Sequence, residues 1–204
     1  MKETTPVLNG AFVLTTPSFG DDRGSFSVTY ERSQAEALGL AKPFVQDNHS
    51  ISAPVHTLRG IHLQLPPYAQ GKLVRVLRGR ILDVVVDLRP GSPTRGEHAA
   101  VELAAGTGEQ LWVPAGFGHA FCTLEPDTEV FYKVDAAYAP EHERSLAWDD
   151  PTLGIAWPAG MTQPVLSAKD AAGSDLATIL AEIDAATAAS TDGAATATEA
   201  GVGR

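Results

Sequence analysis

The segment TLRGIHLQLPPYAQGKLVRVLRGRILDVVVDLRP, residues 57–90, predicts three consecutive β-strands. Its apolar runs are short and are separated by a proline turn and by glycines. The last run, DVVVDLR, is apolar at consecutive positions, which indicates a strand at the centre of a double-layered core. Similar runs, with Gly, Pro, Asp or Asn clusters between them, recur over the first three quarters of the chain. This spacing favours an antiparallel sandwich or barrel over a parallel α/β sheet.

Composition narrows the class of protein. A chain of 204 residues is long enough for one domain with a substantial core. Its net charge of −10 argues against general binding to nucleic acids or acidic membranes. The N-terminal MKETTPVLNG has no apolar signal core, and no apolar run is long enough to cross a bilayer, so we expect a cytoplasmic protein. The single cysteine, Cys122, excludes an internal disulfide framework, and its apolar neighbours predict a buried structural thiol.

Helical patterns are sparse. ERSQAEALGL, residues 31–40, predicts a short helix that Gly39 ends, and residues 174–189 predict an amphipathic helix with Ser174 as its N-cap. From Ala185 the chain consists mainly of Ala, Thr, Gly and Ser, which lack the apolar surface needed to offset ordering entropy. We therefore expect a folded domain over residues 1–184 and a disordered, low-complexity tail over residues 185–204.

His62 is the first candidate for chemistry. In a strand it points away from Ile61 and Leu63 and shares a face with Gly60 and Gln64. Considered alone, it is either a structural histidine on a solvated face or part of a polar pocket in a barrel mouth. Arg59 lies one residue out of this register.

A second histidine lies in VPAGFGHAF, where Pro114, Gly116 and His119 have the P-x-G-x-x-H spacing of the second cupin motif. The first cupin motif supplies metal ligands through H-x-H, and here Gln64 stands two residues after His62. A three-histidine metal centre is therefore not supported, and we expect no metal.

Two tyrosines lie in EVFYKVDAAYAPEHE, residues 129–143. Tyr132, within a β-run, is either a core side chain or a functional one, whereas Tyr138, before Ala-Pro, is more typical of a surface or ligand-stacking residue. Farther along, Lys169 and Asp170 in LSAKD resemble an ordinary solvated charge pair when they are considered alone.

Together, eight ordered motifs from Asp21 to Asp170 closely resemble the dTDP-4-dehydrorhamnose 3,5-epimerase family, the RmlC-like cupins of deoxysugar biosynthesis. The matching segments are DDRGSF, FVQDNHSIS, TLRGIHLQLPPYAQGKLVRVLRG, DVVVDLRPGSPT, VPAGFGHAF, YKVDAAYAPEHE, WDDPTLGIAWP and LSAKD. The resemblance implies an all-β, cupin-type jelly-roll barrel with short peripheral helices. It also implies a homodimer that needs no cofactor and acts on a small molecule, a dTDP-4-keto-6-deoxyhexose.

The resemblance also implies roles for individual residues. By the family pattern His62 is the general base, Asp170 orients it, Tyr132 donates a proton and Lys72 lies against the developing enolate. Tyr138 matches the aromatic residue that stacks on thymine. The other positions that match substrate contacts are Arg23, Gln46, Asp47, Asn48, Arg59, His119, Glu143 and Lys169.

The chain departs from the family pattern at a few positions. Val28 stands where an acidic residue is usual, with Glu31 as a candidate replacement, and Arg95 stands where an aromatic residue is common. The main expectation is inversion of C3 and C5 of dTDP-4-dehydro-6-deoxy-D-glucose. The alternatives are an epimerase acting at C3 or C5 alone, a keto-isomerase, a non-catalytic nucleotide-sugar-binding cupin, and a metal-dependent cupin oxygenase.

Overall fold

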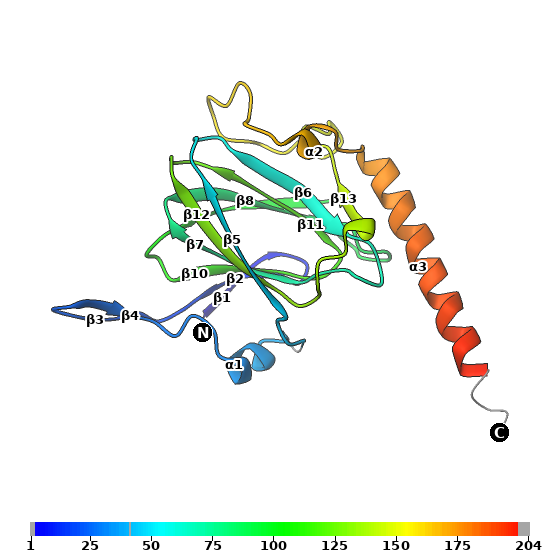
Figure 1. Cartoon of the computed structure of the whole chain (residues 1–204), viewed down its shortest axis with the longest axis horizontal. Helices are drawn as coiled ribbons and strands as arrows, with labels where there is room; N and C mark the ends of the chain where they lie inside the picture. The colour runs from blue at the N-terminus through cyan, green and yellow to red at the C-terminus, as the bar shows by residue number, and fades with distance from the viewer. Residues whose placement is uncertain (1–2, 41, 200–204) are drawn as a thin grey trace.

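Two antiparallel sheets packed face to face form the body of the molecule (Figure 1). The computed structural model describes residues 3–40 and 42–199. The six-stranded sheet has the order β1 (Glu3–Leu8), β2 (Ala11–Thr15), β10 (Glu109–Val113), β7 (Lys72–Arg78), β12 (Thr128–Val134) and β5 (Gln46–Ser52). The five-stranded sheet has the order β13 (Glu143–Ser145), β6 (Leu58–Gln64), β11 (Phe117–Thr123), β8 (Arg80–Asp87) and β9 (His98–Ala104). The prediction of an antiparallel jelly-roll barrel is confirmed.

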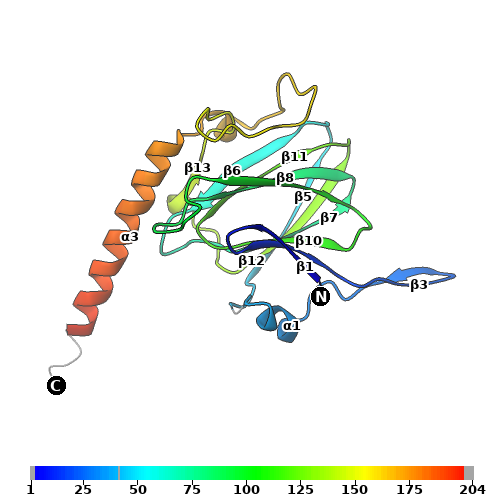
Figure 2. The ribbon, with the colours of Figure 1, turned by 180° about the vertical axis from the view of Figure 1, so that it is seen from behind.

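Smaller elements surround the barrel. A separate hairpin of β3 (Phe19–Asp21) and β4 (Gly24–Phe26) projects away from it (Figures 1 and 2). The helical elements are α1 (Arg32–Ala37), the 3₁₀ turn η1 (Pro140–His142), α2 (Ala168–Ala171) and α3 (Leu176–Glu199). None of the described helices is long and apolar enough to span a membrane, and the expected cytoplasmic location stays a prediction.

β8 lies inside the five-stranded sheet and is buried on both faces, as its uninterrupted apolar run predicts. Val85 packs between the two sheets with Val74, Leu111 and Val130 from the facing sheet. Val84 points the other way, into a second apolar cluster. The strand therefore separates two hydrophobic cores.

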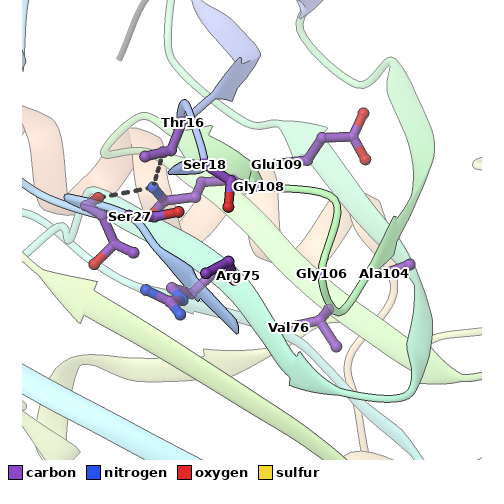
Figure 3. A pocket seen from close by; sticks show the side chains of 12 residues that line it. Thr16, Ser18, Ser27, Arg75, Val76, Ala104, Gly106, Gly108 and Glu109 are labelled. Carbon is purple, nitrogen blue, oxygen red and sulfur yellow. Dashed lines mark hydrogen bonds between the residues drawn. The ribbon is translucent and has the colours of Figure 1, made fainter. Parts of the chain in front are cut away.

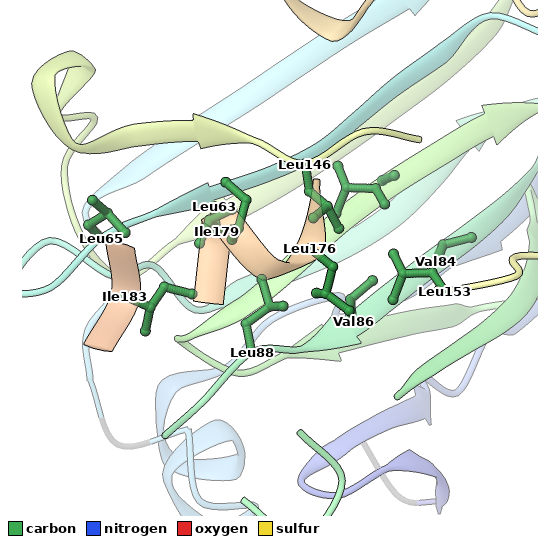
Figure 4. Close-up of a cluster of buried hydrophobic side chains, with 12 residues drawn as sticks. Leu63, Leu65, Val84, Val86, Leu88, Leu146, Leu153, Leu176, Ile179 and Ile183 are labelled. Atoms are coloured by element: carbon green, nitrogen blue, oxygen red, sulfur yellow. The ribbon is translucent and has the colours of Figure 1, made fainter. Parts of the chain in front are cut away.

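The second cluster lies between the outer face of the five-stranded sheet and α3 (Figure 4). Leu63 and Val86 from the sheet pack there with Leu146, Ile179 and Ile183. Burying one such side chain contributes about 1.5–3 kcal/mol. Because Ile179 and Ile183 lie in the first two turns of α3, these turns chiefly hold the helix to the barrel. Farther along, Arg95 reaches the helix through an ion pair with Asp184 at 2.8 Å.

The predicted helix at residues 31–40 is confirmed as α1, and Gly39 ends it as expected. Gly39 has a φ of +86°, and the N–H of Leu40 donates to the carbonyl of Ala35 at 3.0 Å. This is the Schellman arrangement, in which a left-handed glycine allows the chain to satisfy the last carbonyls of the helix.

The predicted N-cap at Ser174 is wrong. Asp175 caps α3 instead, because its Oδ1 accepts the N–H of Thr178 at 2.7 Å. The backbone N–H of Ser174 donates to the carbonyl of Ser145, so Ser174 belongs to the connection with the barrel.

The far end of α3 also differs from the expectation. The helix continues to Glu199, where composition had predicted a disordered tail from Ala185. Alanine has the highest intrinsic helix propensity, so an alanine-rich segment forms a helix even though it lacks large apolar residues. Residues 200–204 of the expected tail lie outside the described residues.

Candidate active site

A cavity of about 420 Å³ opens inside the barrel, with walls from both sheets. We name this cavity the chamber. It brings together all of the predicted site residues except Arg23 and Asp47. Its lining residues are Gln46, Asn48, Ser50, Arg59, His62, Lys72, His119, Phe121, Tyr132, Tyr138, Glu143, Ser167, Lys169 and Asp170.

β5 supplies one wall through the two-residue alternation of a strand. Gln46, Asn48 and Ser50 face the chamber, and the amide of Gln46 donates to Asn48 Oδ1 at 2.7 Å. The intervening Asp47 faces the other side of the sheet and pairs with Lys133 at 2.9 Å. The side chain of Asp47 is therefore not brought into the chamber, because its neighbours occupy the inward positions.

A change of register in β6 places Arg59 beside His62. His62 pairs with His119 and Arg59 pairs with Phe121, so three steps along β6 match two steps along β11. This bulge turns Arg59 into the chamber, and the expectation that it lies out of register with His62 is wrong. Gly60 permits the bulge: its φ is +123°, and a Cβ there would lie 2.6 Å from the carbonyl oxygen of His119.

His62 forms a hydrogen-bonded pair with Asp170 of α2. The His62 Nε2 and Asp170 Oδ1 atoms are 2.5 Å apart, and Ser167 donates to the other carboxylate oxygen at 2.8 Å. Burial acts to raise the pKa of Asp170, but the hydrogen bonds from His62 and Ser167 outweigh it and lower the pKa below its usual range. An ionised carboxylate only accepts, so Nε2 carries the proton and Nδ1 keeps the lone pair of a base.

Lys72 lies on the facing sheet and is almost fully buried. Burial lowers the pKa of its ammonium group to about 8, and the charge of Asp83 is the largest effect that opposes this. Lys72 Nζ lies 3.5 Å from the backbone carbonyl oxygen of His62. The chamber thus holds a cation close to the backbone of the residue that is suited to act as a base.

Tyr132 approaches from β12, on the sheet opposite His62. Burial raises the pKa of its phenol, and the charge of Arg59 opposes this. Among the described residues, its hydroxyl has no hydrogen-bond partner. The phenol therefore stays protonated at neutral pH and is available to a bound molecule.

Polar groups surround the mouth of the chamber. The Tyr138 hydroxyl donates to Glu143 at 2.7 Å, and Lys169 pairs with the other oxygen of Glu143 at 2.7 Å. Burial acts to raise the pKa of Glu143, but the hydrogen bonds from Lys169 and Tyr138 bring the net pKa below its usual value. The Tyr138 ring is half exposed and accessible for stacking.

Arg23 does not line the chamber; it lies between β3 and β4, on the hairpin that projects from the barrel (Figure 1). Its guanidinium pairs with Asp21 at 2.5 Å, and its side chain is 89% exposed. Val28 and Glu31 also lie outside the chamber, and Glu31 accepts a hydrogen bond from Ser33. Glu31 therefore does not replace the missing acidic group within this copy of the chain.

Four side chains in or beside the chamber are not among those predicted to form the site: Ser50, Phe121 and Ser167, which line it, and Asp83, which does not. Ser50 continues the inward alternation of Gln46 and Asn48, and Phe121 continues that of His119. Asp83 of β8 lies behind His119, which donates to its Oδ1 from Nε2 at 2.7 Å. The spacing in the sequence predicts the first two, whereas the pairing of β8 with β11 is needed to find Asp83.

A second cavity, of about 280 Å³, lies near the base of the hairpin (Figure 3). Serine and threonine hydroxyls and Arg75 line it, and the Gln110 amide donates to Thr16 and to the carbonyl of Thr29. It contains no histidine to serve as a base near neutral pH, so the chamber is the better candidate for catalysis. The described residues contain no group of three or more His, Cys, Asp or Glu side chains placed to hold a metal ion.

Residues 5–178 match the family model described as dTDP-4-dehydrorhamnose 3,5-epimerase. The chain belongs to the dTDP-4-dehydrorhamnose 3,5-epimerase family. Members of this family are isomerases that act on carbohydrates, and the jelly-roll barrel described above is their shared fold.

Individual members of the dTDP-4-dehydrorhamnose 3,5-epimerase family are closely similar. An enzyme of that name from Sinorhizobium fredii is 54% identical over 156 residues, which are 74% of this chain and 77% of the relative. The crystal structure of an epimerase from Legionella pneumophila, in complex with dTDP-4-keto-L-rhamnose, is 40% identical, with a TM-score of 0.81 over 87% of this chain and 96% of that one. A 3′-monoepimerase from Streptomyces bikiniensis, in complex with dTDP-quinovose, is 37% identical, with a TM-score of 0.76 over 83% and 85% of the two chains.

Proposed function

We propose that this enzyme inverts C3 and C5 of dTDP-4-dehydro-6-deoxy-D-glucose to give dTDP-4-dehydro-L-rhamnose, without a cofactor. The observation that carries the proposal is the arrangement of the chamber. A His–Asp pair lies on one wall, a protonated tyrosine lies on the facing wall, and a buried lysine lies within the same cavity.

Proton removal is the first step. The ketone at C4 acidifies the C–H bonds at C3 and C5, so a base with a pKa near neutral removes a proton if the enolate oxygen is stabilised at once. His62 Nδ1 takes the proton, and Asp170 holds the imidazolium that results. The electron pair of the C–H bond moves to the C4 oxygen, whose negative charge the Lys72 ammonium stabilises.

Proton return from the opposite face completes each inversion. Tyr132 gives its phenolic proton to the same carbon as the enolate collapses to the ketone. The proton on His62 passes to solvent, and the tyrosinate takes one from solvent, so the enzyme returns to its starting state. Because the two groups lie on opposite sheets, the new C–H bond forms on the face that the old one did not occupy.

The charged groups of the chamber suit the nucleotide. Arg59 and Lys169 supply positive charge for a diphosphate, which reconciles an anionic substrate with an acidic protein. Tyr138 at the mouth offers a ring for the thymine base, and Gln46 and Asn48 offer hydrogen bonds to the sugar.

A homodimer is part of the proposal. Arg23 matches a substrate-contacting position of the family, yet it lies on the projecting hairpin, outside the chamber of its own chain. Phe19 and Phe26 on the same hairpin are about two-thirds exposed, which suits burial against a second copy. Arg23 would then complete the site of that second copy.

Mixed dimers test this arrangement. Neither His62→Ala nor Arg23→Ala dimers should turn over normally, but unfolding and refolding them together should restore about a quarter of wild-type activity, because half of the dimers then carry one intact site. Refolded single variants are the control. No recovery in a mixture that light scattering shows to be dimeric would place Arg23 in its own site or in none.

The second candidate is epimerisation at one carbon only. It is favoured by the similarity to the S. bikiniensis 3′-monoepimerase and by Val28 in place of the usual acidic residue. A keto-isomerase remains within the same chemistry, because it also begins from the enolate.

The test is turnover in deuterated water, with deuterium counted at each carbon of the product by NMR. The main proposal requires deuterium at both C3 and C5. Deuterium at one carbon would favour the second candidate, and migration of the carbonyl would favour the keto-isomerase. Tight binding with no exchange would indicate a non-catalytic nucleotide-sugar-binding cupin. Stoichiometric transition metal in the purified protein would reopen the oxygenase alternative.

A further inference from the structure

Asp83 is a carboxylate enclosed in the hydrophobic interior. It lies on β8, and its side chain is fully buried. Ile81 and Val85, two residues away on either side, face the core between the two sheets. A charge in such a place is costly unless other groups compensate it, so its partners indicate what it does.

The contacts of Asp83 are incomplete. Oδ1 accepts the Nε2 proton of His119 at 2.7 Å, while Oδ2 is buried and has no hydrogen-bond partner among the described residues. Because a carboxylate only accepts, this contact assigns the proton of neutral His119 to Nε2. Nδ1 is then the only ring nitrogen that can meet a substrate, and it meets it as an acceptor.

His119 stays neutral at neutral pH. Burial lowers the pKa of its imidazole, and the interactions with Asp83 oppose this only in part. The negative charge of Asp83 is therefore not cancelled by His119. This negative charge can therefore stabilise the positive charge of a second group that lines the chamber.

That second group is Lys72. The charged and titratable groups that face it come from several elements: Asp83 of β8, Glu143 of β13, Lys169 of α2, His62 of β6, His119 of β11 and Tyr132 of β12. Glu143 already pairs with Lys169 at 2.7 Å. Asp83 pairs with no lysine or arginine among the described residues, and it is the carboxylate that acts most strongly on Lys72.

We propose that Asp83 is a positioning residue that holds His119 in the Nε2–H tautomer and keeps the buried Lys72 protonated for the enolate. This inference deepens the proposed function and rests on it. Asp83 touches neither substrate nor reacting atoms, so it acts through its two neighbours. A merely structural role would require only the hydrogen bond to His119 and would leave the charge of Lys72 unaffected.

Asp83→Asn separates these roles, because the asparagine Oδ1 still accepts from His119 while the charge is gone. We expect the alkaline limb of the kcat/KM profile, which Lys72 sets near pH 8 in the wild type, to move to lower pH by about one unit. Relative to the wild type, the variant should therefore lose about fivefold in kcat/KM at pH 8 and less than about 1.5-fold at pH 6.5. In an Asp83→Asn, Lys72→Arg double variant this limb should vanish, since a guanidinium stays charged.

Asp87→Asn is the matched control. Asp87 is a fully buried carboxylate of the same strand, but it bonds to Arg89, Ser92 and Thr94 outside the chamber. Its loss should lower the melting temperature and leave the pH profile in place. An Asp83→Asn enzyme with the wild-type profile would overturn the inference, whereas a wild type that exchanges no deuterium would overturn the proposed function instead.

A second variant keeps the test decisive if Asp83→Asn does not fold. His119→Gln retains the charge of Asp83 and offers it an amide N–H. KM should rise while the limb stays near pH 8. A limb moved to lower pH in His119→Gln would show that the imidazole, and not the carboxylate, sets the charge of Lys72.

Discussion

Two histidines on the same sheet each pair with an aspartate, and the two pairs differ in how accessible the imidazole ring is. His62 and His119 are register partners on β6 and β11. The side chain of His62 is 26% exposed to the chamber, and its aspartate comes from α2, outside the sheet. The His119 side chain is only 6% exposed, and its aspartate lies within the sheet on β8. The proposed roles follow this difference: we propose a base where the ring is accessible and a positioning role where it is enclosed.

The largest loss of activity should come from breaking the more accessible pair, His62 with Asp170. Asp170→Asn should lower kcat about 100- to 1000-fold with little change in KM, because the amide no longer fixes the tautomer or stabilises the imidazolium. Steady-state kinetics at pH 6.5 measure this loss. Asp83→Asn at the same pH should lose far less. Equal losses for the two variants would mean that the pairs do not differ in role.

The next largest effect is expected for Tyr132→Phe, which tests whether Tyr132, on the sheet that faces His62 and Asp170, returns the proton. Product formation should fall about 100-fold, since the return proton has no donor, while His62 still removes and returns a proton on its own face. NMR in deuterated water should find deuterium entering unconverted substrate faster than product appears. Exchange and inversion falling together would give Tyr132 a part in the first step.

The pH profile of kcat/KM tests the role of Lys72, which lies on the sheet that faces both histidines. Burial places the pKa of Lys72 near 8, and the enolate needs its charged form, so wild-type kcat/KM should fall about tenfold per pH unit above pH 8. Lys72→Arg should be slower at pH 7 but should lack this limb. A wild-type profile that stays flat to pH 9.5 would contradict the assignment of Lys72.

The smallest effects are expected for two neighbouring polar residues of β5, of which one faces the chamber and the other faces outward. Asn48→Ala should raise KM about tenfold, because Asn48 points inward. Asp47→Ala should change KM less than about twofold, since it removes only an outward ion pair with Lys133. A larger effect for Asp47→Ala would place that side chain against substrate.

The sequence predicts the sheets and the cores through local patterns, and it predicts most of the chamber residues through the family resemblance. The apolar run through Val84 and Val86 predicts a central strand, and alternation along β5 places Gln46 and Asn48 on one face. What it misses depends on contacts between distant segments. The register shift that turns Arg59 inward is a property of two paired strands, and Asp83 meets His119 only because β8 lies beside β11.

The two ends of α3 differ from the prediction for local physical reasons. Asp175 displaces Ser174 as a cap, because the backbone of Ser174 is already bound to Ser145 in the barrel. The alanine-rich end of α3 shows that a segment without large apolar residues still has strong helix propensity. Arg23 lies between β3 and β4, and no periodicity in the sequence of this hairpin predicts that it projects away from the barrel (Figure 1).

Deuterium exchange into recovered substrate by His62→Ala, with His119→Ala measured beside it, tests the central claim most directly. The account predicts no exchange above background for His62→Ala, with nucleotide binding nearly unchanged, and slow but measurable exchange for His119→Ala. Near-normal exchange by His62→Ala would contradict the assignment of His62 as the base. Exchange lost only in His119→Ala would instead identify His119 as the base.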